Sequence, residues 1–395
     1  MSRISTKGPH HWRPDNARTL LYNWQWQNRC LALTQTPSRR MINIRISRIA
    51  MPDSQPDTHP DTHPDKHPTS HPAWSITMSS LPVISMTGLT SELPAARRAA
   101  AATLGQACRE TGFFCLVDHG IPDALFRQLF QDAGTFFAQP ADAKNALSIK
   151  RSPHNRGYVA MQDEKLNPEA GADSKEAFNI GLELPDDHPD ILTGKPYRGV
   201  NYWPDLPGWR ERMLAYFEHC LEVGRILHRG FALDLGIQED FFAPLLERPI
   251  ATLRLLHYPP QHGRQTREDA GAGAHTDYGN VTLLKTDGVP GLEVRNRAGE
   301  WVAVPDIPGA FICNIGDCLM RWSNDIYQST PHRVRAPERE RFSAAFFIEA
   351  DPDAMIDPRD LFPGQAPHYP PIKCSDYMDE RLNATYDHRV KAGGM

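Results

Sequence analysis

The sequence predicts a mainly β protein whose α-helices precede and flank a domain of short antiparallel strands. Two observations predict this class. Short apolar stretches separated by turn residues recur through residues 251–350, a spacing typical of an antiparallel barrel or sandwich. Before that region, apolar residues recur at helical spacing in three runs between residues 94 and 236. A long polar prefix precedes the predicted fold.

Residues 1–77 form this prefix, which we expect to be disordered and rich in Pro and His. It holds ten Lys or Arg and five Asp or Glu, so it is net +5 while the remaining chain is net −10. Its segment PDTHPDTHPDKHPTSHP has a proline at every fourth position, which removes amide donors and clashes with each preceding helical turn. Met78 is followed at once by a predicted strand and is an alternative natural start, which would leave the prefix outside the natural chain.

Two functions of the prefix are weighed and not favoured. His59, His63, His67 and His71 could chelate a metal, but a flexible tract has no helix to align them. The first 50 residues are Arg-rich, as transit peptides are, yet they lack an amphipathic period. We therefore interpret the prefix as solvated chain.

The helices follow in chain order. The alanine-rich run over 94–112 predicts a helix that ends at its final glycine, and FFCLV over 113–117 predicts a strand. A second helix is expected over 122–139, with a proline accepted at its start. One long helix is expected over 209–236. Residues 151–200 are rich in Gly, Pro and Asp and lack a strong period, so we expect an ordered excursion or a lid there and no core element.

The strands come last and complete the organisation of the chain. Seven apolar stretches predict them: ATLRLLHY, VTLLKT, GLEVRN, WVAVPD, AFICNIGD, HRVRA and RFSAAFFIEA. We divide the chain into the prefix 1–77, an N-terminal α/β region 78–208, a backing helix 209–248, a β core 249–350 and a C-terminal extension 351–395.

Composition excludes several classes of protein. The chain has 395 residues and a formal net charge of −5, which gives no basic surface for a phosphate backbone, so no nucleic-acid partner is expected. No apolar run approaches the ~18 residues that cross a bilayer, so no membrane partner is expected. The seven cysteines are odd in number and contain no CxxC pair, which argues against a disulfide framework or a zinc cluster and favours a cytoplasmic location.

His275 and Asp277 stand two residues apart in GAHTDYGNVTLL, in a strand-like context. Residues at i and i+2 of a strand share a face, so this imidazole and carboxylate supply two-thirds of a facial metal triad. His332, 57 residues after His275, is the natural third ligand, because that separation lets it arrive on a distant strand. Two histidines and one carboxylate leave coordination positions open, as in non-haem Fe(II) oxygenases.

Arg341 and Ser343 form a second i and i+2 pair, nine residues beyond His332. A planar guanidinium binds a carboxylate through two hydrogen bonds and a serine hydroxyl adds one more, so the pair suits the distal end of a dicarboxylate. Tyr258 could supply a third donor. The alternative is an arginine in a structural ion pair and a serine in a strand.

Other motifs are interpreted as structural. GAGAH over 271–275 lacks the GxGxxG spacing and the following helix of a phosphate loop, so we expect a turn before a strand. Of Phe346 and Phe347, one should face the barrel interior and the other the elements behind it. Three further histidines occur in no spaced metal pattern: His119, His228 and His257.

At these motifs the sequence resembles the Fe(II) and 2-oxoglutarate-dependent oxygenase superfamily, in its isopenicillin N synthase-like branch. The likeness runs from about Leu81 to Tyr386 and includes GFFCLVDHGIP, RGYVAMQDEKLNP, DSKEAFNIG, NYWP, LRLLHYPP, HTDYGNVTLL, STPHRV, RFSAAFF and RLNATY. It implies a double-stranded β-helix (jelly-roll) core, with His275, Asp277 and His332 on Fe(II) and with Arg341, Ser343 and Tyr258 on 2-oxoglutarate. Leu256 departs from plant members, which usually have asparagine there.

The resemblance also implies a reaction. We expect a dioxygenase that uses Fe(II), 2-oxoglutarate and O2 to hydroxylate or desaturate a small organic substrate, with release of succinate and CO2 and no catalytic residue beyond the metal ligands. Three alternatives stay open: an isopenicillin N synthase-type oxidase that uses no 2-oxoglutarate, an ethylene- and succinate-forming enzyme, and a non-catalytic jelly-roll protein that binds a metal or small ligand. The sequence predicts neither the substrate nor the oligomeric state.

Overall fold

The computed structural model describes residues 81–164, 173–261 and 270–385. The prefix 1–77 lies outside the described residues, so its disorder and the alternative start at Met78 stay predictions. Within the described ranges, each helix is too short or too polar to cross a bilayer.

Helices lie on the outside of the β core. They are α2 (Met86–Leu89), α3 (Pro94–Glu110), α4 (Asp123–Phe137), α5 (Ala141–Asn145), α6 (Pro189–Leu192), α7 (Trp209–Leu235), α8 (Asp317–Trp322), α9 (Pro358–Leu361) and α10 (Cys374–Thr385), with 3-10 turns η1 (Ile149–Arg151) and η2 (Pro244–Leu246). The three helices predicted over 94–112, 122–139 and 209–236 are confirmed as α3, α4 and α7.

The strands form two larger sheets and one two-stranded sheet. They are β1 (Val83–Ser85), β2 (Phe113–Val117), β3 (Gly157–Val159), β4 (Glu176–Gly181), β5 (Ala251–Tyr258), β6 (Ala270–His275), β7 (Val281–Thr286), β8 (Leu292–Arg295), β9 (Trp301–Ala303), β10 (Phe311–Ile315), β11 (His332–Arg335), β12 (Arg341–Ile348), β13 (Met355–Ile356) and β14 (Ile372–Lys373). The larger sheet has the order β1-β2-β10-β7-β12-β5-β4-β3, the four-stranded sheet has the order β6-β11-β8-β9, and β13 pairs with β14. Apart from the parallel pair β1 and β2, their neighbours are antiparallel.

These two sheets with flanking helices confirm the predicted mainly β class and its jelly-roll core. The larger sheet contains strands from both the 78–208 and the 249–350 regions. The region boundaries at 208, 248 and 350 stay predictions.

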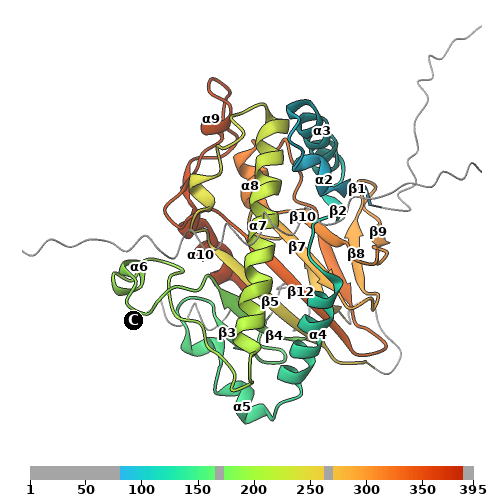
Figure 1. The fold of residues 1–395 in the computed structure, drawn as a ribbon, viewed down its shortest axis with the longest axis vertical. Helices are drawn as coiled ribbons and strands as arrows, with labels where there is room; N and C mark the ends of the chain where they lie inside the picture. The colour runs from blue at the N-terminus through green and yellow to red at the C-terminus, as the bar shows by residue number, and fades with distance from the viewer. Residues whose placement is uncertain (1–80, 165–172, 262–269, 386–395) are drawn as a thin grey trace, which may run out of the picture. The chain divides into compact units, whose positions relative to one another are not determined.

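Helix α7 covers the face of the larger sheet, with α4 beside it (Figure 1). Glycines on either side end the helix cleanly, because Gly208 and Gly236 both adopt positive φ, at 68° and 73°. Within α7, a Cβ at Gly224 would lie 2.0 Å from the Cδ1 of Ile348 in β12, so glycine allows the helix to approach the strand closely.

Strand β12 divides its side chains between two environments, as the alternation of a strand requires. Phe346 packs on Phe217 of α7 with ring centroids 4.8 Å apart, while Phe347 lines the cavity described below. The predicted division between these two phenylalanines is therefore confirmed.

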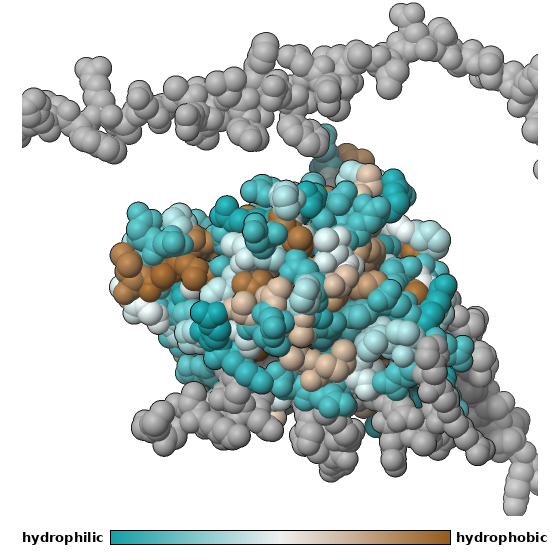
Figure 2. Space-filling view, turned by 90° about the horizontal axis from the view of Figure 1, so that it is seen from below, coloured by the Kyte–Doolittle hydropathy of each residue, from teal (hydrophilic) through white to brown (hydrophobic). Residues whose placement is uncertain are grey.

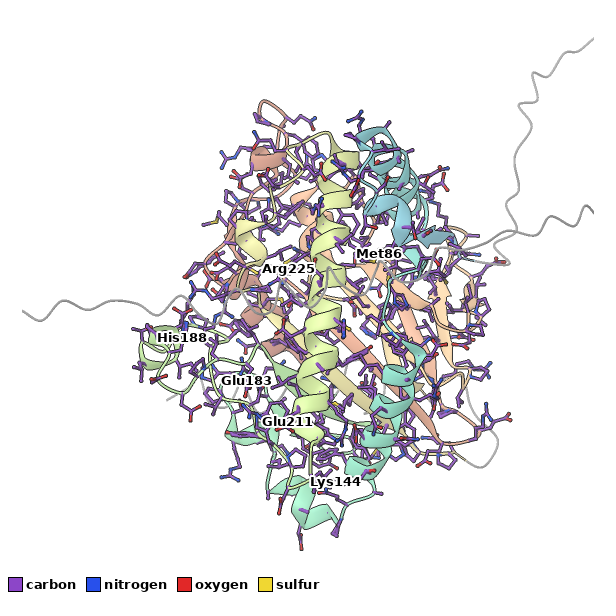
Figure 3. All side chains as sticks on the ribbon, viewed as in Figure 1. Met86, Lys144, Glu183, His188, Glu211 and Arg225 are labelled. Atoms are coloured by element: carbon purple, nitrogen blue, oxygen red, sulfur yellow. The ribbon has the colours of Figure 1, made fainter. Side chains whose placement is uncertain are left out.

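The expectation for residues 151–200 is wrong in one respect, because the segment contributes core strands. β4 is buried along its whole length and pairs with β5, and β3 forms the sheet edge. Its buried Glu176 is satisfied by Lys144, Tyr158 and His257, at 2.7, 2.5 and 2.7 Å. Figure 3 labels Lys144, in α5. Because these buried polar groups pair with one another, a core strand can form from a polar stretch of sequence.

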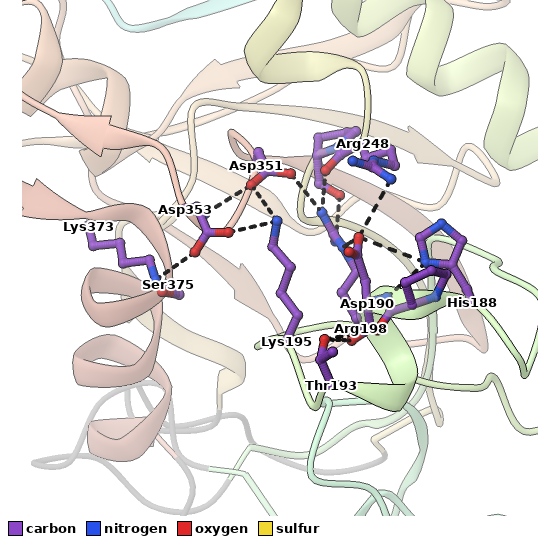
Figure 4. A network of polar contacts seen from close by, with 12 residues as sticks. His188, Asp190, Thr193, Lys195, Arg198, Arg248, Asp351, Asp353, Lys373 and Ser375 are labelled. Carbon is purple, nitrogen blue, oxygen red and sulfur yellow. Dashed lines mark hydrogen bonds and ion pairs between the residues drawn. The ribbon is translucent and has the colours of Figure 1, made fainter.

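The remainder of the segment is held by a network of charges (Figure 4). The side chain of Arg198 is 0% exposed and contacts Asp351 at 3.2 Å, and Lys195 contacts Asp351 and Asp353 at 3.1 and 2.8 Å. Lys373 reaches the other carboxylate oxygen of Asp353 at 2.6 Å. The excursion is therefore anchored to the chain that follows β12.

The expectation of a turn at 271–275 is also wrong. This stretch belongs to β6, which pairs with β11. Its Gly and Ala residues carry no alternating pattern that would predict a strand, and Gly271 lets the strand pass close to the Tyr258 ring, 3.0 Å from where a Cβ would lie.

One face of the folded unit is mainly hydrophilic, and Figure 2 shows apolar residues gathered on a projection from it. The projection lies on the side where Figure 1 places α6, and Leu192 of α6 is 73% exposed.

Candidate metal and cosubstrate site

The structure brings His275, Asp277 and His332 together, with one candidate ligand atom from each lying within 4.8 Å of the others. The Oδ1 atom of Asp277 lies 3.7 Å from Nε2 of His275 and 3.6 Å from Nε2 of His332. His275 ends β6 and His332 begins the neighbouring β11, directly opposite it in register. Asp277 lies after β6, in the connection to β7. The prediction that it shares a strand with His275 is therefore wrong.

Hydrogen bonds fix which atom of each side chain faces the common point. Nδ1–H of His275 donates to the carbonyl of Gly273 at 2.8 Å, and Nδ1–H of His332 donates to that of Thr330 at 3.2 Å, which leaves both Nε2 atoms as acceptors. This tautomer is the one that allows each histidine to bind a metal through Nε2.

The carboxylate of Asp277 is oriented in the same way. Its Oδ2 accepts from the hydroxyl of Thr282 at 2.5 Å and from the amide of Asn314 at 2.7 Å. Only Oδ1 is therefore directed at the two imidazoles.

Electrostatics favour the metal-binding protonation states. Burial, together with the neighbouring His332, lowers the pKa of His275 to about 4. Burial alone would raise the pKa of Asp277, but the two imidazoles and the hydrogen bonds from Thr282 and Asn314 outweigh it, so the pKa lies below its ordinary value. A neutral imidazole and an ionised carboxylate are the forms that bind metals.

Arg341, Ser343 and Tyr258 also lie together, at one end of the same cavity. The guanidinium of Arg341 is stacked on the ring of Tyr258, with Cζ 4.8 Å from its centroid, and Nη1 donates to the hydroxyl of Ser343 at 3.3 Å. Nε donates to the carbonyl of Val289 at 3.2 Å. Arg341 is 1% exposed, and no carboxylate among residues 81–164, 173–261 and 270–385 lies within ion-pair distance of it.

The cavity between these two groups has a volume of about 150 Å³. Alternate residues of β12 form its floor, while apolar side chains of α10 close one side. These lining residues are Arg341, Ser343, Ala345, Phe347 and Glu349 from β12 and its end, and Met378, Leu382 and Thr385 from α10.

Polar side chains on or near the strands beside β12 in the same sheet also line this cavity. Glu164, Lys175, Asn179 and Arg254 line it, and the first three come from the segment that the sequence assigned to an excursion. Nζ of Lys175 lies 3.0 Å from Glu164 and also contacts Asp173, while Nη2 of Arg254 lies 2.6 Å from Glu164. These buried charges are therefore paired with one another.

Sequence reasoning missed Glu349 and α10 as parts of the site. Alternation along β12 from Arg341 could have placed Glu349 in the cavity. Burial and the charge of Asp277 raise the pKa of Glu349 to about 8. Its Oε2 has no hydrogen-bond partner in the described part of the chain. The contribution of α10 depends on tertiary packing and has no local signal.

The three histidines expected to be structural lie outside the cavity lining. His119 contacts the carbonyl of Gly309 at 2.7 Å, and His257 contacts Glu176 at 2.7 Å. His228 contacts the carbonyl of Gly224 at 2.7 Å.

The donor set fits a non-haem iron centre. Two imidazole nitrogens and one carboxylate oxygen converge on a cavity, which leaves room for further ligands, whereas a closed zinc site needs a fourth protein ligand.

Two family models match the chain. Residues 81–206 match the model described as the N-terminal region of non-haem dioxygenases in morphine synthesis. Residues 249–350 match the model of the 2OG-Fe(II) oxygenase superfamily.

Two similar proteins are named as an oxidoreductase and a hydroxylase. The 2-oxoglutarate-Fe(II) type oxidoreductase hxnY of Emericella nidulans is 36% identical over 290 residues, covering 71% of this chain and 83% of the relative. A homoarginine-6-hydroxylase of Oryza sativa is 40% identical over 263 residues, covering 65% of this chain and 79% of the relative.

The similar proteins with solved structures include one that binds alpha-KG. A full-length Neurospora crassa protein in complex with alpha-KG aligns with a TM-score of 0.67 and 27% identity, covering 77% of this chain and 96% of that one. A second structure of that protein holds alpha-KG together with thymine.

Proposed function

Because the chain belongs to the 2OG-Fe(II) oxygenase superfamily and is an Fe(II)- and 2-oxoglutarate-dependent dioxygenase, we propose that it hydroxylates or desaturates a small organic substrate and releases succinate and CO2. Membership confirms the resemblance drawn from the sequence. The reaction outcome and the residue roles below are our proposal.

Each residue of the site has a proposed task. His275, Asp277 and His332 hold Fe(II) through two Nε2 atoms and Oδ1, the atoms that their hydrogen bonds leave directed at one point. Bound Fe(II) and 2-oxoglutarate together supply the activation of dioxygen for oxidation of the substrate. The protein binds, orients and encloses the reactants.

The observation that carries the cosubstrate assignment is the state of Arg341. A guanidinium that is 1% exposed, lines the cavity and lacks a carboxylate partner among the described residues is costly to bury. A carboxylate of 2-oxoglutarate would supply its counter-charge through two parallel hydrogen bonds. The Ser343 hydroxyl and Tyr258, packed against the guanidinium, would complete the binding pocket.

A metabolite screen tests the proposal. The protein is incubated with Fe(II), 2-oxoglutarate and candidate substrates, headed by homoarginine, for which a relative is named, and thymine, which a similar solved structure holds. We expect succinate release that one class of substrate stimulates and that requires 2-oxoglutarate. Turnover without 2-oxoglutarate would identify the oxidase alternative, and ethylene would identify the ethylene-forming one. Absence of oxygen consumption throughout would favour a binding protein.

A reducing, cytoplasmic setting is part of the same proposal. Six cysteines in the described ranges are free and buried: Cys108, Cys115, Cys220, Cys313, Cys318 and Cys374. Free thiols of this kind are typical of reducing compartments.

A further inference from the structure

We propose that the C-terminal helix α10 positions the metal-ligand loop, through Arg381 and Thr385, which hold the residues on either side of Asp277. This inference rests on the proposed function, because it takes Asp277 as a ligand of Fe(II). It assigns Arg381 and Thr385 as positioning residues.

The loop over 276–280 joins β6 to β7, and α8 holds its backbone. The N–H of Asp317 donates to the carbonyl of Asp277 at 2.8 Å, and the N–H of Cys318 donates to that of Tyr278 at 3.1 Å. These bonds fix the path of the loop backbone. They do not involve the side chains of the residues before and after Asp277.

The residue before Asp277 is tied to α10 through a carboxylate. Thr276 donates its hydroxyl hydrogen to Oδ2 of Asp317 at 3.0 Å, and the same oxygen lies 2.9 Å from Nη1 of Arg381. The side chain of Asp317 is 8% exposed, so its charge depends on this guanidinium.

The residue after Asp277 is tied to α10 directly. Cζ of Arg381 lies 4.5 Å from the centroid of the Tyr278 ring, a cation–π contact. The Tyr278 hydroxyl lies 2.5 Å from that of Thr385, which itself donates to the carbonyl of Arg381 at 3.1 Å. Because a threonine hydroxyl has one hydrogen to donate, Tyr278 is the donor to Thr385.

The same helix also closes the cavity. Met378, Leu382 and Thr385 line it together with Thr276 and Tyr278. One wall therefore carries both the surface that a substrate contacts and the contacts that hold Asp277. Binding at the metal and packing against α10 should favour each other, because each orders the same loop.

A pair of matched variants separates positioning from general stabilisation. The side chains of Arg381 and Asp317 are 37% and 8% exposed, and those of Arg212 and Asp132, which pair α7 with α4 away from the cavity, are 37% and 6% exposed. Arg381→Met and Arg212→Met thus each remove an ion pair of similar exposure, and Arg212 holds Asp132 more tightly, through both Nε and Nη2 at 2.7 Å. Both should lower the melting temperature, Arg212→Met by at least as much as Arg381→Met.

Only Arg381→Met should affect the metal site. We expect its Kd for Fe(II) to rise about tenfold, the range seen when groups that orient metal ligands are removed. Amide hydrogen exchange in 276–280 should accelerate in the metal-free protein. Arg381→Lys should recover part of the loss, because it restores the charge beside Asp317 but not the flat stack on Tyr278. Thr385→Val, which keeps the ion pair, should give a smaller effect of the same sign.

Two results would overturn the inference: unchanged Fe(II) affinity and loop exchange in Arg381→Met, or an equal loss of Fe(II) affinity in Arg212→Met. Failure of the proposed function is distinguishable, because it would appear in the unmodified protein as absence of Fe(II) binding or of turnover with 2-oxoglutarate.

Discussion

At the scale of single residues, each proposed metal ligand suits its role because its remaining polar atom is already occupied. His275 and His332 donate Nδ1–H to backbone carbonyls, and Asp277 accepts two hydrogen bonds on the oxygen that faces away. The site is preorganised because these bonds select the tautomers and carboxylate orientation in advance.

Removing any one of these ligands should abolish iron binding and turnover. In His275→Ala, Asp277→Ala or His332→Ala, the two remaining ligands cannot hold a labile ferrous ion. Iron content after anaerobic loading and desalting measures this loss. The control is His188→Ala, which should keep its iron. His188 lies outside the cavity lining and is labelled in Figure 3. Normal iron content in any triad variant would remove that residue from the site.

Arg341→Ala should weaken 2-oxoglutarate binding roughly tenfold to a hundredfold, because a charge-assisted bidentate contact is worth about 1.5 to 3 kcal/mol. Arg341→Lys should recover only part of the affinity, because an ammonium cannot make two parallel hydrogen bonds, and Ser343→Ala should lose less than either. Fe(II) affinity should survive in all three. The KM for 2-oxoglutarate checks this prediction, and an increase confined to the KM of a carboxylate substrate would contradict it.

At the scale of elements, α7 is tied to the ligand loop through His228. Nδ1–H of His228 donates to the carbonyl of Gly224 at 2.7 Å, so Nε2 accepts from the amide of Asn280, 3.1 Å away. Burial lowers the pKa of His228 from 6.5 to about 4. The folded protein therefore keeps this imidazole neutral at pH values where the unfolded chain protonates it.

Stability should fall as the pH falls from about 6.5 to about 4, because the unfolded state then binds the proton that the folded state refuses. The loss through His228 is limited to roughly 3 kcal/mol for a fully buried group. Urea unfolding at several pH values, for the unmodified protein and His228→Gln, measures it. The variant should be less stable at pH 7 but should lose less stability on acidification. Parallel curves would exclude His228 as the source.

The elements that the sequence predicts are those with a strong local pattern. Packing in the fold favours the same elements as the local pattern does. The helices predicted over 94–112 and 209–236 and the alternation along β12 are therefore confirmed. β4 is missed because Glu176 is satisfied by partners from three other segments, which no local pattern reveals. β6 is missed because Gly and Ala give no alternation.

The candidate site divides in the same way. His275 and Asp277 could be found because their spacing is local, and Arg341 and Ser343 for the same reason. The contacts of Arg381 with Asp317 and Tyr278 could not, because they join residues 64 and 103 positions apart.

At the scale of the whole molecule, deleting residues 1–77 should leave melting temperature and turnover nearly unchanged. A Pro-punctuated polar tract buries little apolar surface and so adds little to stability. Calorimetry and succinate release, compared between the full chain and a chain that starts at Met78, check this. Insolubility of the shortened chain would show that the prefix packs on the body.

The spacing of the cavity residues along β12 limits how the sequences of proteins with this fold can evolve. The proposed cosubstrate contacts at 341 and 343 and the cavity positions 345, 347 and 349 follow one another at intervals of two along this strand and its end. Point mutations at the last three can reshape the space for a substrate while the first two keep the cosubstrate. A one-residue insertion or deletion within the strand would instead turn every later side chain to the opposite face. New specificities on this scaffold should therefore arise by replacement along β12, with changes of length confined to the loops around the cavity mouth.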